Sequence, residues 1–324
     1  MKRSAGVAAA ALAASLALAV PTFAQQYPTR PVRFVVPFAP GGSTDTLART
    51  MGVKLADALG QQVVVDNRPG ANGDIGMLIV ARAPADGHTI VLGYIANLAI
   101  APSLQAKMPY NPLIDFAPIT QPASSPNVLT AHPSVPARNL QELIALAKSK
   151  PGELSFASTG VASVGHLTGE LLNHLAGIKI THVPYKGSGQ AVTDLLGGHV
   201  QIMFSGFSST LHHIKAGKLR ALAVTGAKRS AALAEVPTIA EQGFPGVEAT
   251  AWYGVLAPAG TPKPVIARLH DELVTILKLP DVTQRLSGLG FEIVGSTPEA
   301  FGAYIRSETT KWEKVVKASG AKPD

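Results

Sequence analysis

The 324-residue sequence contains no cysteine. This absence excludes disulfide bonds, and it also excludes a lipid anchor attached to a cysteine near the N-terminus. A chain without cysteine is compatible with an oxidising compartment, but the absence does not by itself indicate one. The remaining residue types must therefore decide where the protein acts.

Long apolar runs are missing after the first residues of the chain. Residues 6–20 are almost entirely alanine, leucine and valine, follow the basic pair Lys2-Arg3, and precede the small-residue site Thr22-Phe23-Ala24. This run is short for a membrane-spanning helix, which needs about 20 residues. We therefore expect residues 1–24 to be a cleaved secretory signal peptide, followed by a soluble, exported product.

Charged residues are also few, at 15% of the chain, and the formal net charge is +7 at pH 7. A positive excess suits anionic ligands. Lysine and arginine are scattered singly, however, without the basic stripe and interleaved aromatic residues that nucleic-acid binding requires. We therefore expect no nucleic-acid partner.

The common catalytic and cofactor motifs are absent. The sequence has no G-x-x-x-x-G-K-[ST] phosphate loop, no G-x-G-x-x-G after a strand, and no G-x-S-x-G nucleophile elbow. Its nine histidines form no H-E-x-x-H or other compact metal-ligand spacing. These absences weaken nucleotide-binding, serine hydrolase and metalloenzyme hypotheses, and we expect no cofactor, no metal and no catalytic residue.

Strand-like and helix-like patterns alternate along the chain. Leucine and methionine recur every four residues from Leu47 to Leu59, and a helix bounded by the N-cap Ser163 and the stop signal Gly177 follows later. This alternation predicts an α/β fold with mixed or parallel sheets flanked by helices. The strand-like runs lie at residues 32–36, 62–65, 89–92, 154–157, 179–183, 199–204 and 219–224.

Two stretches interrupt this alternation. Residues 109–126 contain five prolines, and residues 237–246 combine proline with glycine. Both are typical of connections between lobes. If the chain crosses at both, lobe one comprises residues 25–123 plus 247–324 and lobe two comprises residues 124–246, an arrangement that predicts a hinged clamp.

Four strand-to-helix loops are rich in glycine and hydroxyl side chains. In open α/β sheets such loops lie where helix N-termini point backbone N–H groups towards a ligand. In any single loop the glycines could merely permit a tight turn. Together, and facing each other from two lobes, the loops predict a site for a small anion. They span residues 39–44, 158–163, 186–189 and 205–209.

Seven segments then make the pattern specific: "YPTRPVRFVVPFAPGGSTDTLAR", "VVVDNRPGANGDIG", "PADGHTIVLG", "MPYNPLIDFAPI", "GKLRALAVTGAKRS", "VPTIAEQGFPG" and "WYGVLAPAGTP". In this order they resemble the Bug family of extracytoplasmic solute receptors of tripartite tricarboxylate transporters, from about Tyr27 to the C-terminus. The resemblance implies a two-lobed type II periplasmic binding protein fold, with a ligand cleft between the lobes. It also implies a monomer without enzymatic activity that delivers a small carboxylate to a membrane permease.

The resemblance places the ligand in the glycine- and serine-rich loops of both lobes. Two positions depart from the usual family pattern. Ser205 replaces an acid, which leaves room for an apolar or aromatic acid packed on Phe207. Tyr94 is either a stacking wall or a residue at the edge of the core. The expected ligand-binding residues are Phe38, Gly42, Ser43, Thr44, Asp45, Tyr94, Asn97, Ser158, Thr159, Gly160, Ser163, His166, Lys186, Gly187, Ser205 and Phe207.

Two alternatives remain open at this point. A secreted α/β hydrolase acting on carboxylate esters would need a base for Ser43, Ser158 or Ser163, and the sequence identifies none. A ligand-sensing receptor would contact a signalling protein instead of a permease. Asp45 could act as a base, although an aspartate in the first turn more often stabilises a helix N-terminus. An aromatic and a dicarboxylic ligand both remain possible.

Overall fold

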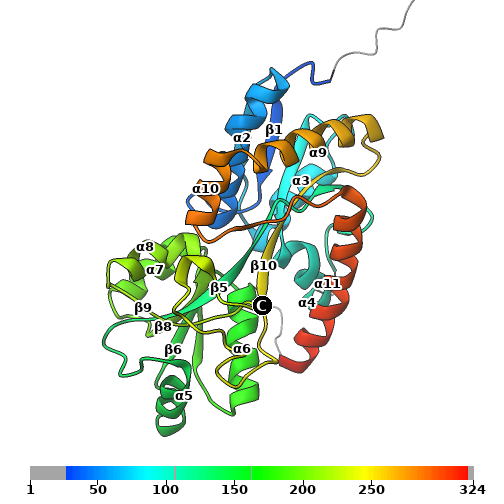
Figure 1. Ribbon diagram of the computed structural model, residues 1–324. Coiled ribbons are helices and arrows are strands. Elements are labelled where there is room, and N and C mark those ends of the chain that lie inside the picture. Colours follow the sequence, from blue (N-terminus) through cyan, green and yellow to red (C-terminus); the bar gives the residue numbers. More distant parts are fainter. Residues whose placement is uncertain (1–26, 106, 162, 320–324) are drawn as a thin grey trace, which may run out of the picture.

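The computed structural model describes residues 27–105, 107–161 and 163–319. The expected signal peptide lies outside these residues. Within them, the chain forms two groups of strands and helices joined by two long strands, β5 and β10 (Figure 1). No helix among these residues is long and apolar enough to cross a membrane.

The first group of strands is parallel where the sequence alternates between strand and helix. β1 lies between β2 and β3 and pairs in parallel with both, and β10 pairs antiparallel with β3 and β4. The loops after β1, β2 and β3 therefore leave the sheet at one edge. These strands are β1 (Val32–Val36), β2 (Val63–Asn67), β3 (Thr89–Tyr94), β4 (Phe116–Thr120) and β10 (Thr250–Pro258).

Helices cover this first sheet because they bury one apolar face against it. Leu47, Met51 and Leu55 of α2 are fully buried with β1, as their four-residue spacing predicts. The helical segments here are α2 (Ser43–Leu59), η1 (Ala71–Gly73), α3 (Asp74–Ala81), η2 (Ala96–Ile100), α4 (Ala101–Leu104), α9 (Lys263–Leu277), α10 (Pro280–Gly288) and α11 (Pro298–Ser319). We call this half lobe one.

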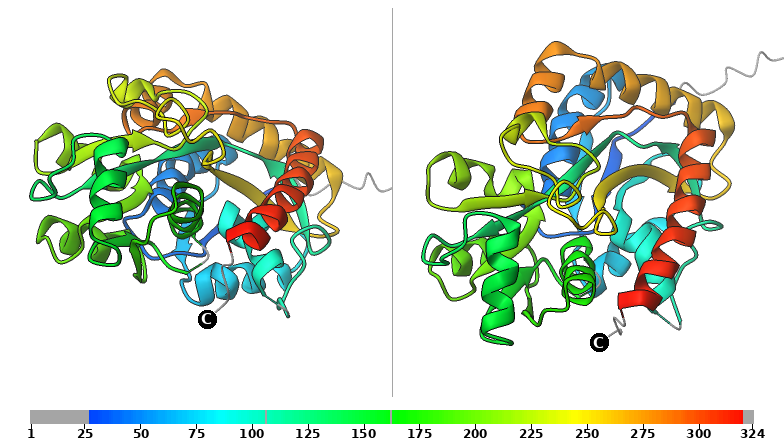
Figure 2. Two further views of the ribbon diagram at one scale, coloured as in Figure 1. Left: turned by 90° about the horizontal axis from the view of Figure 1, so that it is seen from below. Right: turned by 60° about the horizontal axis from the view of Figure 1, so that its bottom comes forward.

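The second half, which we call lobe two, is also a sheet covered by helices, and it has a separate hydrophobic core. β6 pairs in parallel with β7 and β8, and β5 pairs antiparallel with β8 and β9. Figure 2 shows helices beside the strands of both lobes. The elements are β5 (Ala123–Ala131), α5 (Leu140–Ser149), β6 (Ser155–Ser158), α6 (Val164–Ala176), β7 (Thr181–Pro184), α7 (Ser188–Leu196), β8 (Ile202–Gly206), α8 (Phe207–Lys215), β9 (Arg220–Val224) and η3 (Ala231–Leu233), and β11 (Glu292–Ile293) pairs with β5.

β5 and β10 each belong to both lobes. Residues 250–252 of β10 pair with residues 124–126 of β5, whereas residues 253–256 pair with β3 of lobe one. Beyond residue 126, β5 pairs with β8 of lobe two. The proline-rich stretch expected to be a connection thus contains two strands, β4 and part of β5.

Side-chain caps begin helices α5 and α6, and the start and stop expected for α6 are confirmed. Asn139 accepts a hydrogen bond from the backbone of Glu142 at 2.8 Å, as in a capping box. Ser163 accepts one from the backbone of His166 at 3.2 Å at the start of α6, and Gly177 ends that helix with a φ of 61°. These caps orient the N-terminus of α6 independently of distant contacts.

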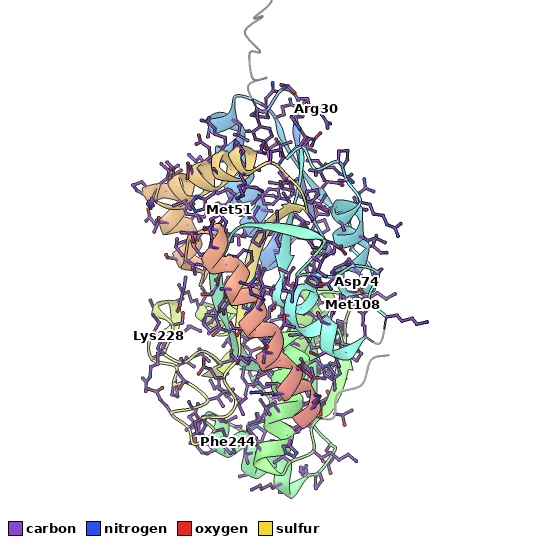
Figure 3. The ribbon with its side chains drawn as sticks, turned by 90° about the vertical axis from the view of Figure 1, so that its right-hand side faces the viewer. Arg30, Met51, Asp74, Met108, Lys228 and Phe244 are labelled. Atoms are coloured by element: carbon purple, nitrogen blue, oxygen red, sulfur yellow. The ribbon has the colours of Figure 1, made fainter. Side chains whose placement is uncertain are left out.

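The long helix α11 contacts both lobes. Phe301 and Ile305 are buried against lobe one, and Trp312 belongs to the same cluster as Leu167 of α6 in lobe two. Figure 3 shows this helix (red) running between the end of the molecule that carries Arg30 and the end that carries Phe244. This helix therefore packs against both halves of the molecule, since it also contacts α6.

Candidate functional site: a cleft between the lobes

A cleft of about 1000 Å³ lies between the lobes. Its walls are the loops that leave the carboxyl ends of β1, β2 and β3 in lobe one and of β6, β7 and β8 in lobe two. This is where open α/β sheets place ligands. Eleven of the expected residues line it: Phe38, Gly42, Ser43, Thr44, Tyr94, Thr159, Gly160, Ser163, Lys186, Gly187 and Ser205.

The lobe-one loop before α2 is shaped by its glycines and by Asp45. Gly41 has a φ of 86°, a conformation that other residues rarely adopt, and extended Gly42 is the N-cap of α2. The carboxylate of Asp45 accepts the Gly41 N–H at 3.0 Å and pairs with Arg49 at 3.0 Å. These contacts hold the loop in place and leave Ser43 and Thr44 at the cleft.

Asp45 itself is 5% exposed and does not line the cleft. Burial on its own raises the pKa of this carboxyl, but hydrogen bonds from Arg49, Gly41 and Asn67 lower the pKa on balance. An ionised, fully engaged carboxylate is a poor general base. Asp45 is therefore a support of the loop, not the ligand contact that the sequence predicted.

Three helices of lobe two begin at the cleft. α6 follows its N-cap Ser163, α7 follows Gly187, and α8 follows Gly206, and all three preceding residues line the cleft. A helix N-terminus carries unsatisfied N–H groups and partial positive charge. The Ser163 hydroxyl accepts the His166 N–H, which leaves its own proton available to a ligand oxygen.

Among the described residues that line the cleft, Lys186 is the one with a formal charge. Lys186 is exposed, and no acidic side chain lines the cleft. A cavity with donors and one ammonium group, and no carboxylate, is electrostatically suited to an anion. In the described part of the chain, no group of three or more histidine, aspartate or glutamate side chains could hold a metal ion.

Ser158 lies behind the lobe-two loop and not at its surface. Its hydroxyl is within 2.7 Å of His182 Nε2 and 2.9 Å of the Gly160 carbonyl oxygen. Burial and the adjacent His166 lower the pKa of His182 from 6.5 to about 3, so the imidazole stays neutral at physiological pH. The structure thus supplies the basic partner for Ser158 that the sequence did not identify.

This serine–histidine contact is nevertheless unsuited to nucleophilic attack. Ser158 is 0% exposed, and a carbonyl oxygen competes with His182 for its proton. Among the residues that the structure describes, no acidic side chain hydrogen-bonds to His182. Its ring instead stacks on that of His166, with the ring centres 4.0 Å apart. His166 is 8% exposed and does not line the cleft. Both expected ligand contacts therefore support the Thr159–Gly160 loop from behind.

Aromatic side chains form one wall of lobe one. The rings of Phe38 and Tyr94 meet edge to face at 5.7 Å, and those of Tyr94 and Tyr253 are 5.3 Å apart. Burial raises the pKa of Tyr253, and a hydrogen bond with Ser43 lowers it only in part, so the phenol remains protonated. This aromatic wall, made of these three residues, therefore begins beside the N-terminus of α2.

The two lobes touch across the cleft. The hydroxyls of Ser43 and Ser208 are 2.5 Å apart, and a Cβ added at Gly206 would lie 2.9 Å from the Ser43 oxygen. Gly206 has a φ of −64°, so its backbone does not require glycine. The absence of a side chain at this position instead permits the close approach of lobe one.

Two further expected contacts lie off the cleft. Phe207 is 0% exposed and belongs to a core cluster with Val128 and Leu211. It packs so closely on Gly290 that a Cβ added to this glycine would lie 2.5 Å from the Cβ of Phe207. The prediction that an aromatic ligand packs on Phe207 is therefore wrong. Asn97 is also 0% exposed, and its side-chain oxygen accepts the Tyr94 N–H at 2.9 Å.

Sequence reasoning missed some of the lining. Residues 69–73, Asn127 and Tyr253 face the cleft although none was selected. The glycines in "NRPGANGD", which follow a strand-like run, were a usable signal for the first of these. Tyr253 gave no comparable signal, because it reaches lobe one on a strand from the other end of the chain.

Comparisons with known proteins agree with this geometry. Residues 47–321 match the model of a family described as tripartite tricarboxylate transporter family receptors. Protein BugT of Bordetella pertussis is 41% identical over 310 residues, which cover 95% of each chain.

Two solved structures share the whole fold. The structure of Rpa4515 from R. palustris with adipate superposes with a TM-score of 0.89 at 38% identity, covering 92% of this chain and all of that one. The periplasmic binding protein BugD has a TM-score of 0.86 at 38% identity, with the same coverage. The two-lobed periplasmic binding protein fold expected from the sequence is confirmed.

Proposed function

The chain belongs to the tripartite tricarboxylate transporter receptor family, and we propose that it captures a small organic carboxylate in the cleft between its lobes. It is a solute receptor of the Bug type, as the 41% identity with BugT indicates. The relative crystallised with adipate shows that this fold holds a carboxylic acid in that protein.

One observation carries the proposal for this chain. The N-termini of α2, α6, α7 and α8 converge on one cleft whose described lining contains Lys186 and no acidic side chain. Each helix N-terminus stabilises an anion by ~0.3–1 kcal/mol when exposed, and by up to about 2 kcal/mol when partly buried. Backbone N–H groups and the hydroxyls of Ser43, Thr44, Thr159 and Ser163 are the donors for the ligand carboxylate.

Capture works by closure of the two lobes. Donors come from both lobes, so a ligand is fully bound only when the lobes meet, and binding stabilises that state. The moving units are residues 25–123 plus 247–324 and residues 124–246. Their hinge lies in β5 and β10, the two strands that belong to both sheets.

Delivery completes the proposed role. The receptor acts as a monomer in the periplasm after cleavage of residues 1–24, and it hands its ligand to a permease of the tripartite tricarboxylate type. Support for the compartment comes from BugD, which is a periplasmic binding protein. The hydrolase alternative is disfavoured by the enclosed Ser158 hydroxyl and by the engaged Asp45 carboxylate.

A ligand screen tests this function. Residues 25–324 are purified, stripped of any carried ligand by reversible unfolding, and melted with aliphatic and aromatic acids. An acid at 100 times its Kd stabilises the protein by about 2.7 kcal/mol, an easily measured shift in Tm. Chromatography of the same mixtures should recover the acid and its ester unchanged. Turnover of either would replace the receptor with an enzyme.

A further inference from the structure

Tyr94 occupies a distinctive place in the cleft. It is the last residue of β3, separated from the π-helical segment η2 by Ile95 alone, and it lines the cavity in a half-buried position. π-Helical turns occur frequently at functional sites. The side chain of Asn97, buried in that segment, holds the Tyr94 backbone N–H at 2.9 Å. The tyrosine is therefore fixed at the carboxyl edge of the lobe-one sheet.

The hydroxyl of Tyr94 is available for a ligand. It makes no hydrogen bond with any residue that the structure describes, and it is not among the fully enclosed polar atoms that lack a partner. Burial of the ring, followed by the neighbouring Tyr253, raises the pKa of this phenol, so the hydroxyl is protonated throughout the physiological range. The Tyr94 hydroxyl is thus a donor without a partner among the described residues, placed on the aromatic wall of the cleft.

The aromatic wall connects this donor to the carboxylate site. Tyr253 hydrogen-bonds Ser43 at the N-terminus of α2, and its ring lies 5.3 Å from that of Tyr94. Phe38 closes the far side of Tyr94 at 5.7 Å. A ligand whose carboxylate lies at Ser43 therefore has aromatic rings beside it in the same cleft, with Tyr94 next to Tyr253 on that wall.

We propose that Tyr94 is the residue that determines specificity, and that the ligand is a planar, aromatic carboxylate whose far end carries a hydrogen-bond acceptor. This inference rests on the proposed carboxylate-binding function and adds the class of ligand. Lobe one selects the flat body through the aromatic wall, because aromatic rings pack favourably edge to face or offset. The Tyr94 hydroxyl selects the distal acceptor.

Three probe acids separate these contributions by isothermal titration. Benzoate and cyclohexanecarboxylate have the same charge and ring size but differ in flatness, and terephthalate adds a distal acceptor to benzoate. The wild-type protein should bind benzoate roughly fivefold more tightly than cyclohexanecarboxylate. It should bind terephthalate roughly tenfold more tightly than benzoate, as expected for a hydrogen bond to a charged acceptor.

Two variants assign the effects to Tyr94. Tyr94→Phe should remove most of the advantage of terephthalate and leave the affinity for benzoate within about twofold, since only the donor is lost. Tyr94→Leu should also remove the preference for benzoate over cyclohexanecarboxylate. Tyr304→Phe deletes a hydroxyl on α11 away from the cleft, and it should match the wild type with all three acids.

The outcomes distinguish this inference from the function on which it rests. If the wild type binds cyclohexanecarboxylate or adipate at least as tightly as both aromatic acids, and Tyr94→Leu does not change that order, the inference is wrong while the receptor function stands. If no carboxylate of any shape binds the stripped wild-type protein, both are wrong. Circular dichroism and Tm of the unliganded variants confirm that each has folded.

Discussion

The two walls of the cleft are built from different chemistry. Lobe two presents three helix N-termini, the hydroxyls of Thr159 and Ser163, and Lys186. Lobe one presents two such N-termini, those of α2 after Gly42 and of α3 after Gly73, each with an aspartate in its first turn, beside the rings of Phe38 and Tyr94. Lobe two therefore supplies most of the electrostatic attraction for an anion. The aromatic rings of lobe one provide most of the surface that selects the shape of the ligand.

This difference follows from the local structure of each lobe. In lobe two the three parallel strands all lead directly into helices, so each contributes an N-terminus. In lobe one only β1 leads directly into a long helix, while β2 and β3 lead into the short segments η1 and η2. Separation of the two roles means that ligand charge and ligand shape should respond to different substitutions.

The largest expected effect is loss of anion binding when lobe two receives a negative charge. Ser163→Asp keeps an N-cap residue on α6 but places a carboxylate in the cleft. Two like charges ~4 Å apart repel by ~4 kcal/mol at an effective dielectric constant of about 20, which weakens binding roughly a thousandfold. Isothermal titration with the best acid measures this.

Asn139→Asp is the matched control, because it adds the same charge to the N-cap of α5, away from the cleft. It should leave the Kd unchanged. Ser163→Ala is a less informative variant, since loss of the cap also destabilises the unliganded fold by ~1 kcal/mol. Equal affinities for wild type and Ser163→Asp would remove α6 from the anion site.

A smaller effect is expected when both walls remain intact but cannot meet. Gly206→Val introduces side-chain atoms where a Cβ alone would lie 2.9 Å from Ser43. Binding of aromatic and aliphatic acids should fall together, by a similar factor of roughly 50, since lobe-one contacts worth ~2–3 kcal/mol are lost. Small-angle scattering should show no compaction when ligand is added.

The control for this variant is Gly288→Val, at the end of α10, where an added Cβ meets no atom within 4 Å. It should bind and compact like the wild type. Ligand-induced compaction of Gly206→Val to the wild-type radius would show that the Ser43–Gly206 approach does not limit closure.

A modest loss of ligand affinity is expected when the charge of Lys186 is removed. This variant separates the contribution of an exposed charge from that of the helix N-termini. The lysine is exposed, so Lys186→Gln should weaken binding only about twofold to fivefold. The loss should shrink as salt is raised, because salt screens exposed charges. Lys148→Gln on α5 is the control. A hundredfold loss would instead make Lys186 the main anion ligand.

The smallest effect on binding is expected at His182, where the consequence is for stability. The folded pKa of about 3 lies below the ordinary 6.5, so the unfolded chain binds a proton first as the pH falls. The contribution of neutral His182 to stability is therefore complete above pH 6.5 and is lost progressively towards pH 3. Tm measured across this range should fall more steeply for the wild type than for His182→Gln.

His182→Gln is informative because its amide can still donate to Ser158 but does not titrate. Subtraction of the two profiles removes the carboxylates that both proteins share. Parallel profiles from pH 6.5 to 3 would mean that folding does not lower the pKa of His182.

Short-range signals made much of this structure predictable. The caps at Asn139 and Ser163 and the spacing of Leu47, Met51 and Leu55 depend on neighbours within a few residues. The glycine-rich loops also have local causes, which is why the anion site on lobe two was largely found in the sequence.

Side-chain direction at the cleft could not be predicted in the same way. Phe207 turns into the core because it packs beside Gly290, far along the chain. Tyr253 reaches the cleft because β10 returns to pair with β3. Both directions are decided by tertiary contacts, so the expected aromatic contact at Phe207 is absent from the cleft, whereas Tyr253 joins the expected Phe38 and Tyr94.

A comparison of acids with their neutral amides shows whether the cleft recognises the charge of a carboxylate. Benzoate against benzamide, and adipate against adipamide, are titrated into the stripped wild-type protein by calorimetry. The account predicts measurable binding of at least one acid, and affinity for its amide at least a hundredfold weaker. Equal affinity for acid and amide would contradict the account, because the helix N-termini of lobe two would then not be binding charge.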